Sequence, residues 1–173
     1  MWFLIHPFAG FWRRQGPRIT YLVVVAVALV IGVALFQLRE PILRVEFGFS
    51  WPLTVMAVFC YAGGVLLEHY YRRQITIGVL FGLPEVSEKR SGRLLTEGIY
   101  GRIRHPRYLG LVFEISGFAL LVNYLAVYVI AIAMVPVVLL IVLLEERELL
   151  ARFGDDYAQY MRSVPRFFPK LDR

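Results

Sequence analysis

The sequence has few of the residues that metal or redox chemistry needs. Its 173 residues include one cysteine, Cys60, and three histidines, at positions 6, 69 and 105. A lone cysteine excludes an intramolecular disulfide, and within an apolar run it is typical of a small buried hydrophobic residue. The histidines are scattered along the chain, and no H-E-x-x-H or C-x-x-C motif occurs. We therefore expect no metal site.

Charge is also scarce. Only 18% of the residues are charged and 58% are hydrophobic, whereas soluble globular domains have about 25% charged residues. This composition predicts an integral membrane protein without a nucleic-acid partner. At this length we expect one membrane domain over residues 1–173, made of an N-terminal segment 1–19, a middle part 20–95 and a motif region 96–169. The oligomeric state has no signature in the sequence.

Four apolar segments have the length, about 20 residues, that a helix needs to cross a bilayer. They are residues 20–38, 51–69, 106–122 and 124–144. Only Asn123 and Tyr124 separate the last two, so we expect a helical hairpin with its turn at Asn123. The predicted fold is all-α, with about four transmembrane helices and a C-terminal cytoplasmic helix. Segment 75–84 is too short to cross, and is expected to be re-entrant or to lie under the headgroups. The third span is short and contains Glu114, which leaves open whether it crosses fully.

The distribution of basic residues predicts the orientation. Every Lys and Arg except Arg39 and Arg44 falls in a segment that a four-span topology places on one face. The positive-inside rule makes this face, with both termini and the site, cytoplasmic. Segment 1–19 combines aromatic residues with arginines. Its apolar residues precede the arginines, unlike a signal peptide, so we expect an interfacial anchor.

A polar cluster, GIYGRIRHPRYLG at 98–110, directly precedes the third span. Pro106 suits the first turn of a helix, which makes His105 the N-cap. The positive end of that helix favours a carboxylate or another anion. Tyr108 lies in the first turn, and Gly110 permits the close approach of a backbone or a ligand. These positions indicate a binding site rather than only a positively charged flank.

A second cluster, acidic, follows the fourth span at Glu145, Glu146 and Glu148. Because the hairpin returns the chain to the face where it started, these carboxylates are expected at the level of His105. Histidine and arginine opposite two carboxylates complement a zwitterion, or a sulfonium that carries both charges.

The motifs G-I-Y-x-x-x-R-H-P-x-Y-L-G, E-E-x-x-L-x-x-x-F-G-x-x-Y-x-x-Y and a closing R-x-x-P occur in that order over residues 96–169. In order and spacing this region resembles the isoprenylcysteine carboxyl methyltransferase family, which belongs with the phospholipid N-methyltransferases. The resemblance implies a membrane enzyme that moves a methyl group from S-adenosylmethionine to a lipophilic acceptor entering from the bilayer, leaving S-adenosylhomocysteine. Membrane lipids are its expected surroundings.

The resemblance also implies roles for individual residues. The cofactor-binding residues would be Tyr100, Arg104, His105, Tyr108, Leu109, Gly110, Glu146, Tyr157 and Tyr160. Glu145 and Glu146 would hold the amino group of the cofactor or assist at the acceptor. Arg166 and Arg152 would meet an acceptor carboxylate or phosphate. Arg104 fits a headgroup anchor equally well.

Several alternatives stay open at this point. A sterol-reductase-like oxidoreductase with a nicotinamide cofactor shares an R-H-P-like motif, and a non-catalytic accessory protein would retain the same fold. The methyl acceptor is a carboxylate, an amine or a thiol. Glu114 either lines the path of the acceptor or lies protonated against a neighbouring helix, because a charge at that depth costs at least a few kcal/mol.

Overall fold

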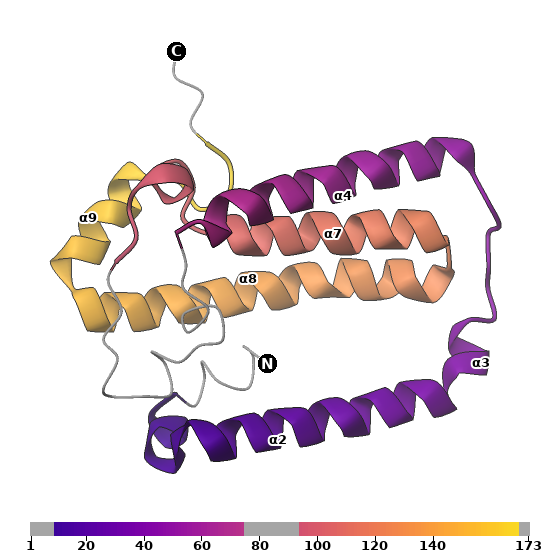
Figure 1. The fold of residues 1–173 in the computed structure, drawn as a ribbon, viewed down its shortest axis with the longest axis horizontal. Coiled ribbons are helices and arrows are strands. Elements are labelled where there is room, and N and C mark those ends of the chain that lie inside the picture. The colour runs from indigo at the N-terminus through magenta and orange to yellow at the C-terminus, as the bar shows by residue number, and fades with distance from the viewer. Residues whose placement is uncertain (1–8, 75–93, 170–173) are drawn as a thin grey trace. The chain divides into compact units, whose positions relative to one another are not determined.

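The described part of the chain is mainly helical. The computed structural model describes residues 9–74 and 94–169 (Figure 1). The helices are α2 (Ala9–Gln37), α3 (Arg39–Ile42), α4 (Trp51–Arg72), the 3-10 helix η2 (Gly98–Gly101), α7 (Pro106–Val122), α8 (Leu125–Phe153) and α9 (Asp155–Ser163). Within these ranges there is no strand, which confirms the all-α prediction. Segment 75–84 and the first eight residues of the predicted anchor lie outside the described residues.

The contacts of the chain group into two units. One comprises residues 1–44 and 75–93, and the other residues 45–74 and 94–173. In the first unit, α2 begins at Ala9 and therefore includes part of the segment predicted as an anchor. Its stretch Arg18–Gln37 is long and apolar enough to cross a membrane. The prediction of one domain over the whole chain stays a prediction.

The second unit is built on three helices that lie side by side, α4, α7 and α8 (Figure 1). α7 runs antiparallel to both neighbours, so the end of α4, the start of α7 and the end of α8 share one end of the unit. With 22 and 29 residues, α4 and α8 are long and apolar enough to span a bilayer. α7 has only 17 residues, fewer than the roughly 20 that a full crossing takes. Among the described residues three helices thus qualify, and the predicted total of four spans depends on α7, the third predicted span.

Small residues allow α7 to lie directly against α4. A Cβ added at Gly117 would lie 3.0 Å from the Ala57 carbonyl oxygen and 3.1 Å from the Tyr61 nitrogen. At Gly64 it would lie 2.6 Å from Cγ of Glu114, whereas at Gly63 nothing lies within 4 Å. Close backbone contact through small residues is a common way for membrane helices to associate. The predicted close approach at Gly110 is likewise made by α4, because its Cβ position is 3.5 Å from the Gly64 carbonyl oxygen.

The hairpin turn is fixed by Asn123, as the sequence predicts. Asn123 caps α7 in the left-handed conformation, with φ 54° and ψ 42°, which asparagine adopts more readily than most residues. Its side-chain amide donates to the Gly48 carbonyl at 2.6 Å, and its side-chain oxygen accepts from the Tyr128 hydroxyl at 2.8 Å. Its backbone carbonyl accepts from the Phe47 N–H at 3.0 Å. The turn is therefore bound to the segment that precedes α4.

Substitution of Asn123 should separate the contribution of its left-handed backbone from that of its side-chain hydrogen bonds. Asn123→Gly keeps the left-handed backbone accessible and loses two side-chain hydrogen bonds, so we expect a loss of about 1–2 kcal/mol. Asn123→Ala loses the same hydrogen bonds and keeps a Cβ in the left-handed region without the polar side chain that makes this region accessible to asparagine, which costs roughly 1 kcal/mol more than Asn123→Gly. Unfolding of the purified variants by sodium dodecyl sulfate in mixed micelles measures both. Wild-type stability of Asn123→Ala would contradict this account of the turn.

Candidate functional site

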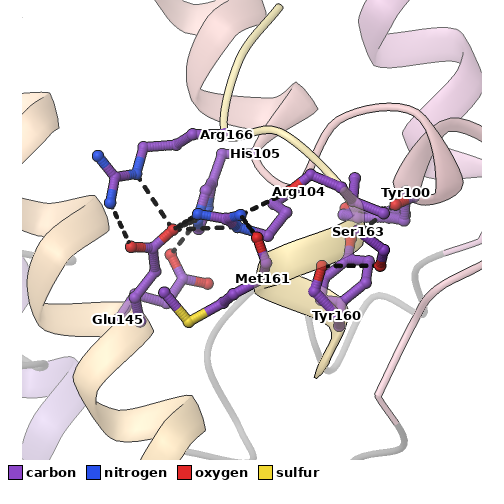
Figure 2. A network of polar contacts seen from close by, with 10 residues as sticks. Tyr100, Arg104, His105, Glu145, Tyr160, Met161, Ser163 and Arg166 are labelled. Carbon is purple, nitrogen blue, oxygen red and sulfur yellow. Dashed lines mark hydrogen bonds and ion pairs between the residues drawn. The ribbon is translucent and has the colours of Figure 1, made fainter. Parts of the chain in front are cut away.

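The backbone before α7 is paired with the C-terminal segment. η2 leads into Arg104 and His105, with His105 at the N-cap and Pro106 at the first helical position, as predicted. The Arg104 N–H donates to the Pro165 carbonyl at 2.9 Å, and the His105 N–H donates to the Arg166 carbonyl at 3.1 Å. Two sequence-distant segments therefore meet at the entry to α7, and their side chains project into the same space (Figure 2).

The centre of this space is the carboxylate of Glu146 on α8, whose side chain is only 4% exposed. Its Oε1 accepts from Nε and Nη2 of Arg104 at 3.2 and 2.7 Å, and lies 3.1 Å from Nε2 of His105. Arg166 donates from Nε to Oε1 at 3.2 Å and from Nη2 to Oε2 at 2.7 Å. A carboxylate buried this deeply is stable only when it is paired and hydrogen-bonded. Both oxygens of Glu146 meet that condition within the protein itself.

Arg104 also joins α9 to this network. Its Nη1 donates to the backbone carbonyls of Met161 and Val164 at 2.9 and 2.6 Å. These carbonyls belong to the end of α9, where a helix leaves its last carbonyls without intrahelical partners. Because the Arg104 side chain is 7% exposed, it does not act as a headgroup anchor. It links the entry of α7, the carboxylate on α8 and the end of α9.

Two tyrosines of α9 form the apolar side of the site. Tyr157 and Tyr160 are buried with Val164 against Leu94, Leu149, Phe153 and Met161. The Tyr160 hydroxyl donates to the Tyr100 carbonyl at 2.6 Å, and burial raises the pKa of Tyr160 to about 12. Burial, reinforced by the nearby Glu146 carboxylate, also raises the pKa of Tyr157. The Tyr157 hydroxyl has no hydrogen-bond partner in the described part of the chain.

The two tyrosines offer a matched pair of tests. Tyr160→Phe removes a satisfied hydrogen bond and should lower the free energy of unfolding by about 1 kcal/mol. Tyr157→Phe removes an unsatisfied buried hydroxyl and should raise it by a similar amount, about 1 kcal/mol. Detergent unfolding of both variants without ligand gives the comparison. If Tyr157→Phe were the less stable of the two, its hydroxyl would have a partner within the folded protein.

The remaining predicted residues take different positions. Tyr108 is buried with its ring 5.8 Å from the His105 imidazole, and Phe167 lies on the same imidazole at 6.1 Å. Leu109 is half-buried beside them in the first turn of α7. Arg152 is partly exposed near the end of α8, with its guanidinium 5.1 Å from the Phe153 ring.

Glu145 differs from its neighbour in having an unused oxygen. Its Oε2 lies 4.0 Å from Nδ1 of His105, too far for a hydrogen bond. It has no hydrogen-bond partner among residues 9–74 and 94–169. The side chain is 24% exposed. The predicted meeting of His105 with both carboxylates is therefore present, but only Glu146 is saturated by the protein.

Sequence reasoning missed the contribution of the backbone near residues 161–167. The carbonyls of Met161, Val164 and Pro165 accept from Arg104, and backbone acceptors carry no residue-type signal. Phe167, which packs on His105, lies within the closing R-x-x-P. That motif is the one local signal that would have indicated it.

Comparison with known proteins identifies the family of the chain. The family described as phospholipid methyltransferase matches residues 52–156, which include α4 except its first residue, α7, α8 and both glutamates of the site. The chain belongs to the phospholipid methyltransferase family. This confirms the resemblance found in the sequence. Together with the three helices suited to crossing a membrane within residues 9–74 and 94–169, it indicates an integral membrane protein.

Relatives of the chain have different names, and the names of two of them specify different methyl acceptors. The chain is 33% identical over 97 residues to the cobalt-zinc-cadmium resistance protein CzcN of Cupriavidus metallidurans, covering 56% of the chain and 44% of that protein. It is 28% identical over 139 residues to the protein-S-isoprenylcysteine O-methyltransferase of Schizosaccharomyces pombe, covering 78% and 56%. It is 27% identical over 184 residues to the methanethiol S-methyltransferase of Mycobacterium tuberculosis, covering 94% and 69%.

The chain thus spans about half the length of the first two relatives, and its family membership does not by itself identify the methyl acceptor. No solved structure is significantly similar to it.

Proposed function

We propose that this protein is a membrane methyltransferase that moves a methyl group from S-adenosylmethionine to a lipophilic acceptor. The observation that carries the proposal is the polar network at one end of the α7–α8 hairpin. In this network Glu146 is saturated, whereas Glu145 and Tyr157 keep unsatisfied polar atoms. Membership of a methyltransferase family supports it.

The residues of the network fit the charges of S-adenosylmethionine, which carries an ammonium, a carboxylate and a sulfonium. Glu145 has an unpaired carboxylate oxygen for a cationic group. Arg166, with 37% of its side chain exposed, has a guanidinium that can pair with the carboxylate of the cofactor. The buried Tyr157 hydroxyl supplies a further hydrogen-bonding atom. When bound, the cofactor supplies an electrophilic methyl group.

The protein itself aligns the cofactor with the methyl acceptor and excludes water from the site. Methyl displacement gains most of its rate from holding two reactants in line at close distance. Tyr157, Tyr160 and Tyr108 are buried and provide apolar walls around the polar atoms. An acceptor that must lose a proton requires a base. Glu146 is already paired with Arg104, His105 and Arg166. Glu145 is therefore the carboxylate that is free to act as the base.

The acceptor reaches this site from the bilayer in our proposal. α4 and α8 expose large apolar side chains over most of their length, among them Val58, Phe59, Ile132 and Leu140, as lipid-facing helices do. The end of the unit with the network also has Arg72, Arg73 and Arg107. By the positive-inside rule we place it on the cytoplasmic side.

Binding of S-adenosylhomocysteine tests the proposal. We expect a saturable calorimetric titration of the detergent-purified protein, no titration with a nicotinamide dinucleotide, and no binding of S-adenosylhomocysteine by His105→Ala. Incubation of membranes with methyl-labelled S-adenosylmethionine should place label in the lipid extract only when the wild-type protein is present. Nicotinamide binding instead would favour a reductase, and binding of neither would favour a non-catalytic protein.

A further inference from the structure

Three large aromatic side chains are exposed near the hairpin turn, at the end of the second unit opposite to the polar network. Phe47 is 57% exposed, Phe49 is 72% exposed and Trp51 is 71% exposed. The ring centroids of Phe49 and Trp51 are 5.1 Å apart, and Phe47 lies 6.3 Å from Tyr128 of α8. An exposed apolar cluster indicates an interaction surface. We call Phe47, Phe49 and Trp51 the aromatic ridge.

The segment that contains the ridge is bound to the hairpin turn. Residues 45–50 precede α4 and run beside the α7–α8 turn (Figure 1). The Phe47 N–H donates to the Asn123 carbonyl at 3.0 Å, and the Leu125 N–H donates to the Val45 carbonyl at 3.1 Å. The ridge therefore has a fixed position relative to α7 and α8.

The backbone of this segment excludes it from the hydrocarbon core of a bilayer. Residues 45–50 are not helical. Lipid-exposed backbone without helical hydrogen bonds does not occur at that depth, because its polar groups would lack partners. Glu46, within the same segment, is exposed, and an exposed carboxylate also requires water. The segment must therefore lie within reach of water.

The side chains of the ridge indicate contact with lipid as well. Trp51 begins α4, and Val55, Val58 and Phe59 follow it at spacings that share one face of a helix. All three are half exposed or more, so the ridge is continuous with the lipid-facing surface of α4. Backbone that requires water and rings that avoid it meet at the boundary between headgroups and acyl chains, where tryptophan and tyrosine are enriched.

We propose that the aromatic ridge is a membrane-docking surface, inserted at the headgroup–acyl boundary of the leaflet opposite the polar network. Its partner is the lipid surface itself. The rings bury their apolar area there, and the indole N–H of Trp51 donates to water or to a headgroup. Because the ridge is bound to the turn at Asn123, it holds that end of the hairpin at a fixed depth. The docking surface does not depend on the proposed function.

The depth of Trp51 in a bilayer tests this proposal. The chain has three tryptophans, so the double variant Trp2→Phe, Trp12→Phe leaves Trp51 alone. The full chain is placed in phosphatidylcholine nanodiscs whose acyl chains have bromine near either the carbonyl end or the methyl end. We expect bromine near the carbonyl end to cause the larger loss of Trp51 fluorescence, because that bromine lies close to the headgroup boundary.

Two further tryptophan positions calibrate the measurement in a background with Trp51→Phe. Phe49→Trp should keep the preference of Trp51, because the non-helical part of the ridge docks at the same depth. Phe59→Trp is the matched control on the exposed face of α4. It lies eight residues after Trp51, about 12 Å further along the helix, and should be quenched more by bromine near the methyl end. Detergent unfolding shows whether each variant is folded.

Three results would overturn the proposal. Quenching of Trp51 by aqueous iodide and by neither lipid would place the ridge in water. Protection from all three quenchers would show that protein covers the ridge, either the first unit of this chain or a second copy. Stronger quenching by bromine near the methyl end would place the ridge in the hydrocarbon core. Trp51 is a native residue, so its result stands even if Phe49→Trp or Phe59→Trp does not fold.

Discussion

Glu146→Gln is expected to lower the free energy of unfolding by about 3–5 kcal/mol, the usual cost of removing one partner from a buried ion pair. The amide has no charge to offset the guanidinium of Arg104, whose side chain is 7% exposed. It also places N–H donors where Arg166 and His105 already donate. The loss should appear as a lower midpoint of unfolding in sodium dodecyl sulfate, followed by tryptophan fluorescence.

The neighbouring residue is a matched control for this effect. Glu145→Gln makes the same chemical change one position earlier on α8, where the carboxylate has an oxygen without a hydrogen-bond partner in the described chain. We expect its stability to change by less than about 1 kcal/mol, as for an exposed or loosely paired charge. Equal destabilisation by the two substitutions would show that the network is not centred on Glu146.

Gly117→Val is expected to be the most disruptive substitution between the helices. Its Cβ alone would lie 3.0 Å from the Ala57 carbonyl oxygen and 3.3 Å from the Cys60 Cβ. Because two of the three nearest atoms are α4 backbone, they cannot rotate away, and α4 must move. Overpacking of this kind costs about 1–3 kcal/mol and sometimes more. The series Gly117→Ala, Gly117→Val should lose stability in that order in detergent unfolding.

Gly63 provides the control position for Gly117→Val. It lies in the middle of α4, next to Gly64, but nothing lies within 4 Å of its Cβ position. Gly63→Val tests the helix propensity of valine without overpacking, and should change stability by less than about 1 kcal/mol. A loss as large as that of Gly117→Val would place the cause in the membrane helix itself rather than in the contact between α4 and α7.

The features that the sequence predicted are those that depend on local signals. Pro106 after His105 predicts a helix start, and Asn123 between two apolar runs predicts a turn. Together they place Glu145 and Glu146 at the level of His105, because the two arms of a hairpin have similar lengths. The helix start, the turn and the shared level of these side chains are all present in the structure. The number of membrane crossings does not follow from these features, because α7 has only 17 residues.

The features that the sequence did not predict depend on tertiary contact. Arg104 has the same local signature as a basic residue at the membrane edge, and its burial results from the pairing of residues 104–105 with 165–166. The two adjacent glutamates have identical chemistry in the sequence. Only the orientation of α8 makes one of them saturated and leaves the other with a free oxygen.

The sequence positions of the network residues also determine when during biosynthesis the network can be completed. Its members come from residues 104–105, 146 and 161–166, so the ribosome delivers the last of them after every helix of the hairpin has emerged. Until Arg166 and the carbonyls of α9 are synthesised, Arg104 and Glu146 have only each other and His105 as partners within the network. The network is therefore complete only after the α7–α8 hairpin and α9 have been synthesised.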